Sequence, residues 1–203
     1  MIKNKKETFV MWNAVAEKYR RWAEFNRWYY RSFANLISKH VKPRLIADIC
    51  CGPGVLGSEL RKVFPSAEIV PVDLSIEMCK FAKAIRADAH SLPFKDDVFE
   101  LAVLCFALHE LEVRKAIREV RRILKKEGAV AIADLNSKAP PIIKFLAETF
   151  LSTLLSPEYA KNLKSKWDAF PDLEELVLIL QDLGFEILYT REFFDVWIIA
   201  KKI

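Results

Sequence analysis

Apolar residues recur along this chain with two spacings, one typical of helices and one typical of buried strands. From residue 8 to about 33 they return every three or four positions, which predicts an amphipathic helix broken near Asn26. Five short, mostly apolar runs then alternate with helical segments or loops. The runs cover residues 45–50, 68–73, 86–89, 99–106 and 129–135. Such an alternation predicts a parallel sheet covered by helices on both faces.

The pattern changes after the fifth run. Residues 142–155 predict an unusually apolar helix, and Asp172 can cap another helix that follows. The last two expected strands, 186–190 and 193–201, are joined by two residues, too few for a parallel crossover, so this pair is antiparallel. The chain therefore predicts an α/β fold: a doubly wound, Rossmann-like sheet of seven strands, mostly parallel, with an antiparallel terminal hairpin.

The composition is that of a globular protein. With 203 residues, 52% of them hydrophobic and 29% charged, the chain can build a sizeable core and is not of the disordered class. Two prolines, Lys144 and Glu148 interrupt the most apolar segment, 139–155, which predicts no membrane span. The N-terminus lacks a signal-peptide pattern, and the four cysteines lack zinc-site spacing. We expect a cytoplasmic protein with reduced thiols and no metal.

Charge is distributed unevenly. Residues 1–44 contain eleven Lys or Arg against three Glu, whereas the remainder has 21 basic and 24 acidic residues. A basic segment can attract acidic ligands or RNA, but charged helix faces are more often solvated surface. The same segment is rich in aromatic residues that can line an acceptor pocket or fill a core. They are Trp12, Trp22, Trp28, Tyr29 and Tyr30.

Glycine use points to a ligand site. The chain has only five glycines, yet three of them fall between positions 52 and 57, as Gly52-Pro53-Gly54 and then Gly57. This is a GxGxxG pattern at a strand-to-helix junction, where open α/β sheets bind ligands. Asp73 follows Gly52 by 21 positions and ends the second strand, where a carboxylate can accept both hydroxyls of a ribose. The two features together predict a cofactor that contains adenosine.

Three further residues separate S-adenosylmethionine (SAM) from NAD. Pro53 removes a backbone N–H that a pyrophosphate would need. Asp48 places a negative charge at the same strand end, which repels pyrophosphate and favours the ammonium of a methionine moiety. Asp88, at the end of the third strand, is suitably placed for the exocyclic amine of adenine. SAM is therefore favoured, and an NAD(P)-dependent Rossmann oxidoreductase is the alternative.

The chain resembles the class I SAM-dependent methyltransferases over nearly its whole length. Residues 45–54 (LIADICCGPG) are similar to the family's first motif, and 72–75 (VDLS) with Met78 to its ribose motif. Residues 87–89 (ADA), followed by LPF, are similar to the adenine motif. Residues 124–128 resemble the turn before the fifth strand, with Lys-Glu in place of the usual Pro-Gly. The closing Leu-Gly-Phe and hairpin also resemble the family.

Within that family, the ubiquinone/menaquinone C-methyltransferase-like branch (methyltransferase type 11) is the most similar, because its N-terminal helix carries an Ala-x-x-Tyr, here Ala16 to Tyr19. Cys50 departs from the family by replacing its usual first glycine. The resemblance implies a set of cofactor-binding residues. These are Tyr19, Asp48, Cys50, Gly52, Pro53, Gly54, Asp73, Leu74, Met78, Asp88, Ala89, Cys105 and Phe106.

The resemblance also implies an organisation and an activity. One methyltransferase domain, 1–203, would comprise an N-terminal helical lid (1–44), a SAM-binding half (45–135), and substrate-side helices and closing strands (136–203). The activity is methyl transfer to a small-molecule acceptor, with an aromatic or acidic acceptor as candidates. The strand end at 105–108 lacks the signatures of enzymes that methylate nucleobases, so a nucleic acid is not expected. A protein that binds SAM without catalysis is a second alternative.

The chemistry requires little base catalysis. Methyl transfer from a sulfonium is an in-line displacement, and holding the nucleophile in line can supply roughly 7 to 11 kcal/mol. His109, just after the fourth strand, is a candidate base for a phenol or enol acceptor. Alternatively, His109 and Glu110 cap the following helix. Asp134 and Asn136, at the end of the fifth strand, either face the acceptor or cap a loop.

Overall fold

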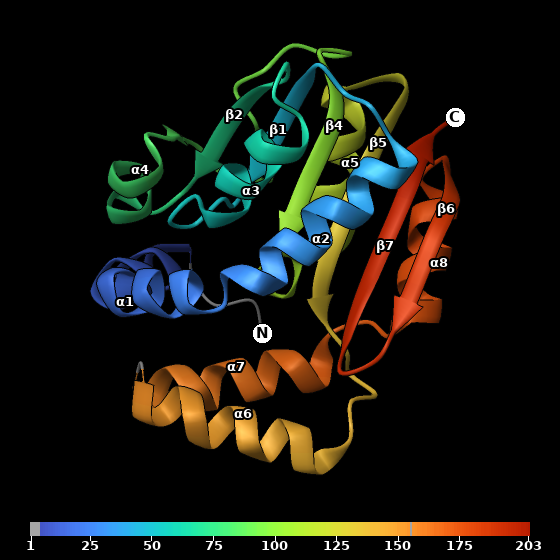
Figure 1. Cartoon of the computed structure of the whole chain (residues 1–203). Coiled ribbons are helices and arrows are strands. Elements are labelled where there is room, and N and C mark those ends of the chain that lie inside the picture. The colour runs from blue at the N-terminus through green and yellow to red at the C-terminus, as the bar shows by residue number, and fades with distance from the viewer. Residues whose placement is uncertain (1–4, 155) are drawn as a thin grey trace.

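The computed structural model describes residues 5–154 and 156–203, and these residues form a seven-stranded sheet with helices on both faces (Figure 1). The strands are β1 (Leu45–Ile49), β2 (Glu68–Asp73), β3 (Ile85–Arg86), β4 (Phe99–Cys105), β5 (Leu124–Leu135), β6 (Phe185–Glu192) and β7 (Asp195–Lys202). The helices are α1 (Lys5–Phe25), α2 (Arg27–His40), α3 (Val55–Val63), α4 (Ile76–Ala82), α5 (Val113–Ile123), α6 (Pro141–Leu154), α7 (Pro157–Ala169) and α8 (Leu173–Asp182), with a 3-10 turn at Leu108–Glu110.

The strand order is β3-β2-β1-β4-β5-β7-β6. Strands β1 to β5 pair in parallel, whereas β7 is antiparallel to both β5 and β6. The hairpin thus inserts its second strand beside β5 and leaves its first at the edge of the sheet. The predicted doubly wound, mostly parallel sheet with an antiparallel terminal hairpin is confirmed, as is the helix break at Asn26.

Three segments differ from the prediction. Strand β3 contains two residues and ends at Arg86, so that Asp88 and Ala89 lie beyond it, and Asp88 forms an isolated bridge with Ser91. Strand β5 begins at Leu124 instead of residue 129, because Leu124 pairs with Phe99 ahead of a register irregularity. Helix α7 was not predicted at all. Its buried residues recur with helical spacing, but frequent lysines between them obscured the pattern; they are Tyr159, Ala160, Leu163 and Trp167.

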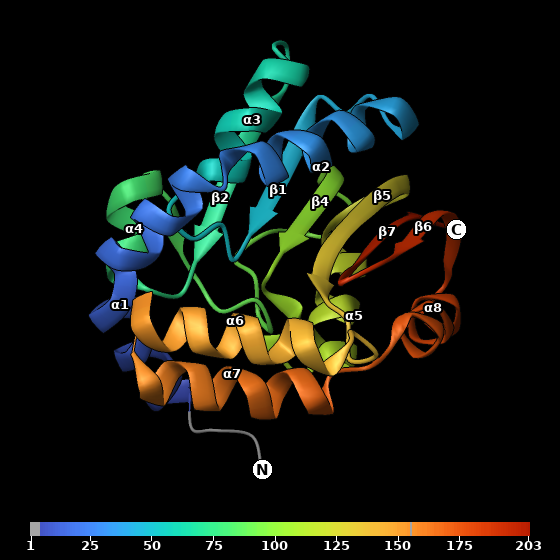
Figure 2. The ribbon, with the colours of Figure 1, turned by 60° about the horizontal axis from the view of Figure 1, so that its bottom comes forward.

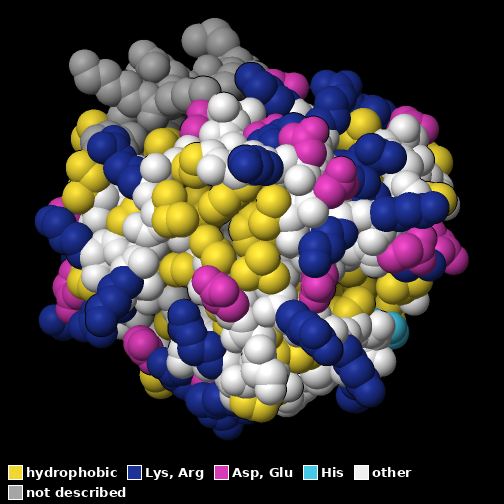
Figure 3. Space-filling model, turned by 90° about the horizontal axis from the view of Figure 1, so that it is seen from above, with side chains coloured by type: hydrophobic (Ala, Val, Ile, Leu, Met, Phe, Trp, Pro, Cys, Tyr) yellow, Lys and Arg dark blue, Asp and Glu magenta, His cyan; other side chains and the backbone are white. Residues whose placement is uncertain are grey.

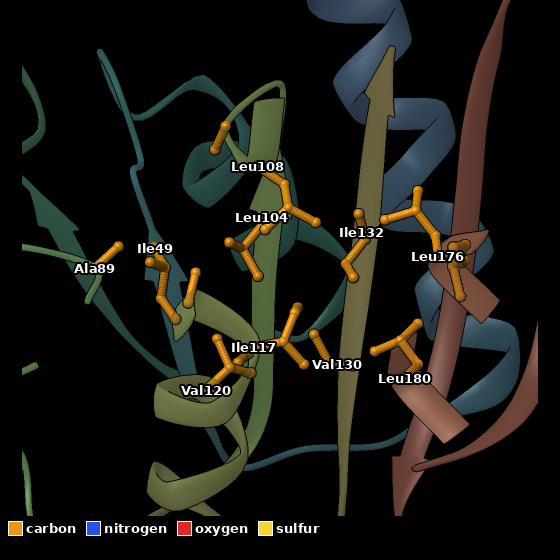
Figure 4. Packing of buried hydrophobic residues seen from close by; sticks show 14 of the residues in the cluster. Ile49, Ala89, Leu104, Leu108, Ile117, Val120, Val130, Ile132, Leu176 and Leu180 are labelled. Atoms are coloured by element: carbon orange, nitrogen blue, oxygen red, sulfur yellow. The ribbon is translucent and has the colours of Figure 1, made fainter. Parts of the chain in front are cut away.

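The core consists of two apolar layers, one on each face of the sheet. On one face, α5 packs against β5 and α8 against β6, and Ile117 and Leu180 belong to one layer with side chains such as Leu104 and Ile132 (Figure 4). On the other face, α2 and α3 contribute to the layer that contains Val103 of β4. Because successive side chains of a strand point to opposite faces, the strands supply both layers.

The segment expected to be a lid therefore divides into two parts. Helix α2 belongs to the core, with Phe33, Ala34 and Ile37 fully buried against the sheet. Helix α1 lies instead beside the carboxyl ends of the parallel strands, where α6 and α7 also lie side by side (Figures 1 and 2). A mobile lid, if the segment contains one, is thus restricted to α1, and that role stays a prediction.

The basic residues of the N-terminal helices are largely paired with carboxylates. Arg20 and Arg21 contact Glu17, and Arg27 and Arg31 contact the buried carboxylate of Glu59. Figure 3 views the end of the sheet that lies opposite to α6 and α7, and it shows basic and acidic side chains interspersed around an apolar area. These features are typical of solvated surface. Among residues 5–154 and 156–203, no helix has the length and apolar character that a membrane span requires.

Candidate active site

A cleft of about 850 Å³ opens at the carboxyl ends of β1, β2 and β4. This volume includes space that is open to solvent. Ten of the thirteen predicted cofactor residues line it: Tyr19, Asp48, Cys50, Gly52, Pro53, Asp73, Leu74, Met78, Cys105 and Phe106. Gly54, Asp88, Ala89 and the candidate base His109 are not part of the lining. Trp12, Tyr30, Glu110 and Leu111 also line the cleft.

The glycine loop between β1 and α3 is held to the end of β2 by Asp73. One oxygen of that carboxylate accepts the N–H of Gly52 at 2.9 Å, and the other accepts the N–H of Ser75 at 2.8 Å. Gly52 and Gly54 both have positive φ, a conformation that glycine adopts without steric cost. Each carboxylate oxygen can accept a further bond. Asp73 is therefore fixed in place and still able to bind hydroxyl groups in the cleft.

Asp48 is a buried carboxylate with an oxygen that lacks a hydrogen-bond partner among the described residues. Gly57 lets α3 approach it closely, since a Cβ at that position would lie 2.9 Å from Asp48 Oδ2. Burial, together with the charge of Asp73, raises the pKa of Asp48 to about 7, although Arg61 partly opposes the shift. A cationic ligand group in the cleft would favour the ionised form. The carboxylate of Asp48 thus fits the methionine ammonium of SAM.

Cysteine side chains form part of the same wall. Cys50 lies in the left-handed region with φ of 54°, which is costly for a residue with a Cβ. Burial, followed by the charge of Asp73, raises the pKa of the Cys50 thiol well above its usual range, and burial does the same for Cys51 and Cys105. The thiols are therefore neutral, and they act as packing groups in this site.

Aromatic side chains from the N-terminal helices face the cleft. Trp12 and Tyr19 of α1 pack edge to face with ring centroids 5.1 Å apart, and Tyr30 of α2 lines the cleft beside them. Tyr29 stacks on Phe106 with a centroid distance of 5.0 Å. Of the five aromatics singled out in this segment, Trp12 and Tyr30 line the cleft, Trp22 and Tyr29 pack behind Phe106, and Trp28 is mostly exposed.

His109 lies behind the wall of the cleft, in the 3-10 turn after β4. Its Nδ1 lies 2.6 Å from Asp134 Oδ1, and its Nε2 is buried without a hydrogen-bond partner among the described residues. Burial lowers the pKa of His109, but Asp134 and then Glu110 outweigh that effect and raise it. Asp134 also accepts the N–H groups of Ala107 and Leu108, so it holds this turn together.

The other predicted polar residues have structural partners. Asn136 donates to the carbonyl of Phe193 at 2.8 Å, which ties the loop before α6 to the tip of the terminal hairpin. Asp88 bonds the ring and backbone nitrogens of His90 outside the cleft, so its role toward adenine stays a prediction. Neither His109 nor Glu110 caps α5, which begins after Glu112.

An ion pair between Glu110 and Lys166 was missed by the sequence reasoning. Glu110 lines the cleft, and its side chain is 9% exposed. Lys166 belongs to α7, the helix that was not predicted, and its ammonium contacts Glu110 Oε2. The sequence placed Glu110 beside a candidate base, but no local signal could have shown that a lysine 56 positions later faces it.

Comparison with known proteins identifies relatives of this site and fold. A family model described as a methyltransferase domain matches residues 47–132. A demethylmenaquinone methyltransferase of Thermotoga maritima is 28% identical over 96% of this chain and 94% of its own length. A 2-phytyl-1,4-naphtoquinone methyltransferase of Nostoc punctiforme is 26% identical over 69% of this chain and 71% of its own.

Solved structures show the same fold at lower identity. A SAM-dependent methyltransferase of Thermotoga maritima, described as a possible histamine N-methyltransferase, has a TM-score of 0.71 at 22% identity over 96% of this chain and all of that one. The [4+2]-cyclase SpnF has a TM-score of 0.65 at 16% identity over 85% of this chain and 80% of that one. Because a cyclase shares the architecture, the fold does not by itself determine the reaction.

Proposed function

We propose that this chain, which is a class I SAM-dependent methyltransferase, transfers the methyl group of SAM to a ring carbon of a quinone-type acceptor in its reduced, hydroquinone form. The buried carboxylate of Asp48, which lines the cleft beside the glycine loop, is the observation that carries the binding mode. Asp48 would bind the methionine ammonium, and Asp73 would bind the ribose hydroxyls. Neither the oxidoreductase nor the non-catalytic alternative has support among the relatives.

The order of the strands supports one orientation of SAM in the cleft. Asp73 ends β2, Asp48 lies in β1, and β4 is the next strand in the sheet. Adjacent strands are about 4.8 Å apart, so the ends of β2 and β4 are separated by about 10 Å. A SAM molecule with its ribose at β2 and its ammonium at β1 would direct its methyl group toward β4. The acceptor would therefore lie near Phe106 and Glu110.

This part of the cleft suits an aromatic ring. The cleft as a whole is lined by Trp12, Tyr19, Tyr30, Phe106 and Leu111, and Glu110 adds a carboxyl group to the lining. The relatives from Thermotoga and Nostoc are named for quinone-type acceptors. The SAM methyl is electrophilic, so the attacking ring carbon must be electron-rich, as it is in a hydroquinone and not in a quinone. Offset or edge contacts with aromatic side chains would hold such a ring at about 0.5 to 1.5 kcal/mol per pair.

A methyl-transfer assay with two acceptors tests the proposal. The enzyme with SAM should methylate 1,4-naphthohydroquinone, kept reduced under argon, and should leave the oxidised 1,4-naphthoquinone unchanged, with product mass as the readout. Histamine serves as the competing acceptor, because a structural relative is described with it. Methylation of histamine with none of the hydroquinone would overturn the proposed acceptor while leaving SAM as the donor.

A further inference from the structure

Four ionisable side chains from three elements meet at the side of the cleft that faces β4. Asp134 Oδ1 lies 2.6 Å from His109 Nδ1, and His109 Nε2 lies 3.7 Å from Glu110 Oε1. The other oxygen of Glu110 forms the ion pair with Lys166 of α7. Of these four residues, Glu110 lines the cleft, and the other three stand behind it. The contacts therefore form a chain that ends at the cleft in a carboxylate.

We propose that Glu110 is the catalytic base that accepts the hydroxyl proton of the acceptor, and that Lys166, His109 and Asp134 are positioning residues that hold its carboxylate in place. This assignment rests on the proposed function, because it requires an acceptor with an ionisable hydroxyl. It differs from the expectation that His109 is the base. A carboxylate in the lining can reach a proton on the acceptor, whereas His109 cannot reach it without a rearrangement of the wall.

The hydrogen bonding of His109 supports this division of roles. Its Nδ1 lies within hydrogen-bond distance of Asp134, which is completely buried. Although burial opposes the shift, the charge of Asp134 also raises the pKa of His109. The remaining nitrogen, Nε2, is buried and lies 3.7 Å from Glu110 Oε1. Neither ring nitrogen is therefore open to a proton of an acceptor in the cleft, and the ring packs beside the Glu110 carboxylate instead.

Lys166 serves the same carboxylate from the opposite side. Its ammonium contacts Glu110 Oε2, so it provides a partner for a carboxylate that is only 9% exposed. The other titratable groups around Glu110 are the phenol of Tyr159 and the thiol of Cys50, whose pKa values burial raises well above their usual ranges, so that both are neutral. Glu110 thus lines the cleft with one oxygen, Oε2, paired with Lys166, and the other, Oε1, in no hydrogen bond with a described residue.

The proposed step balances in atoms and charge. The hydroquinone O–H proton passes to Glu110, and the electron pair released into the ring makes the neighbouring ring carbon nucleophilic. That carbon attacks the SAM methyl carbon, the C–S bond breaks, and its electron pair stays on sulfur to give S-adenosylhomocysteine. The methylated carbon then loses its hydrogen as a proton to water, and the oxygen regains the proton from Glu110. The net products are the methylated hydroquinone, S-adenosylhomocysteine and one proton.

Glu110→Gln tests the assignment, with Glu112→Gln as the matched control. Glu112 is two positions away and exposed, so the same change there leaves the cleft intact. With 1,4-naphthohydroquinone and SAM, kcat of Glu110→Gln should fall by about 100-fold to 10,000-fold, the usual contribution of a general base. SAM affinity, measured by calorimetry, should change less than threefold. The activity that remains should rise with pH toward about 10, because a phenolic hydroxyl then ionises without a base.

Each outcome decides between the two levels of the proposal. If the wild type methylates the hydroquinone and Glu110→Gln matches Glu112→Gln across the pH range, Glu110 is not the base. If Glu110→Gln loses SAM binding, its role is structural and the assignment fails. If the wild type fails to methylate the hydroquinone but binds SAM, the proposed acceptor is wrong and the base assignment falls with it. Lys166→Met should lower kcat and shift the pH profile, and Lys166→Arg should restore both.

Discussion

The two halves of the cleft are built in different ways. The half at the ends of β1 and β2 is a short loop whose backbone is fixed by its own glycines and by Asp73. The half at the end of β4 is a set of side chains from β5, the 3-10 turn and α7, which meet only when those elements pack together. The first half can bind a constant cofactor with local contacts. The second half can vary with the acceptor, because its groups come from three separate elements.

The halves also treat buried charge differently. Asp48 has one oxygen without a hydrogen-bond partner among the described residues, and its carboxylate lines the cleft, where a cationic ligand can engage it. Asp134, in contrast, is surrounded by donors from the turn after β4 and from His109. A buried group that waits for a ligand weakens the free protein, whereas a buried group with a full set of partners supports the fold. Substitutions in the half at β1 and β2 should therefore mainly affect SAM binding, and substitution of Asp134 should mainly affect stability.

The largest effect should follow from Asp134→Ala, because it leaves several buried donors without an acceptor. The free energy of unfolding should fall by about 3 to 5 kcal/mol, the range for breaking a buried charged pair. Urea denaturation followed by circular dichroism measures it. Asp134→Asn keeps one oxygen for the turn and should lose less. Equal stability of Asp134→Ala and the wild type would remove the structural role assigned to this residue.

The pH dependence of the free energy of unfolding should show the protonation of Asp48. Its pKa of about 7 in the folded protein lies above the ordinary value of 3.8, so between these values the folded state holds a proton that the unfolded state has released. Rising pH therefore removes stability, by about 3 kcal/mol between pH 4 and pH 7, relative to Asp48→Asn. Urea denaturation of both proteins at four pH values measures the difference. Parallel curves for the two proteins would contradict the raised pKa.

The difference between the halves also explains what the sequence could predict. The glycine loop, Asp48 and Asp73 lie within 27 residues, and each has a signal in its own strand or turn. Glu110 and Lys166 carry no such signal, because α7 was obscured by lysines within its apolar spacing. The fold was predicted for the same reason as the loop: strands and helices are encoded by local periodicity. Convergence of distant side chains is set by packing, which one sequence does not reveal.

An intermediate effect is expected for Asp73→Ala. Its carboxylate would bind the ribose and also holds the N–H groups of Gly52 and Ser75. The loss of a hydrogen-bonded charged group should weaken SAM binding by about 1.5 to 3 kcal/mol. Calorimetric titration measures the loss of affinity. Asp73→Asn keeps one acceptor for the loop, so its SAM affinity should lie between those of the wild type and Asp73→Ala. Unchanged affinity in Asp73→Ala would remove the ribose role.

The smallest effect should come from Cys50→Gly, which tests whether the cofactor half tolerates strain in its own loop. Cys50 has φ of 54°, and an L-residue in that region carries a cost of roughly 1 to 2 kcal/mol. Glycine removes the cost but gains entropy in the unfolded chain, worth roughly 0.5 to 1 kcal/mol. The variant should therefore be more stable by up to about 1 kcal/mol.

Cys51→Gly is the matched control. Cys51 has no positive φ, so the same change at this neighbouring position should destabilise the protein by about 1 kcal/mol. If both variants lose stability equally in urea denaturation, the left-handed conformation of Cys50 is not strained.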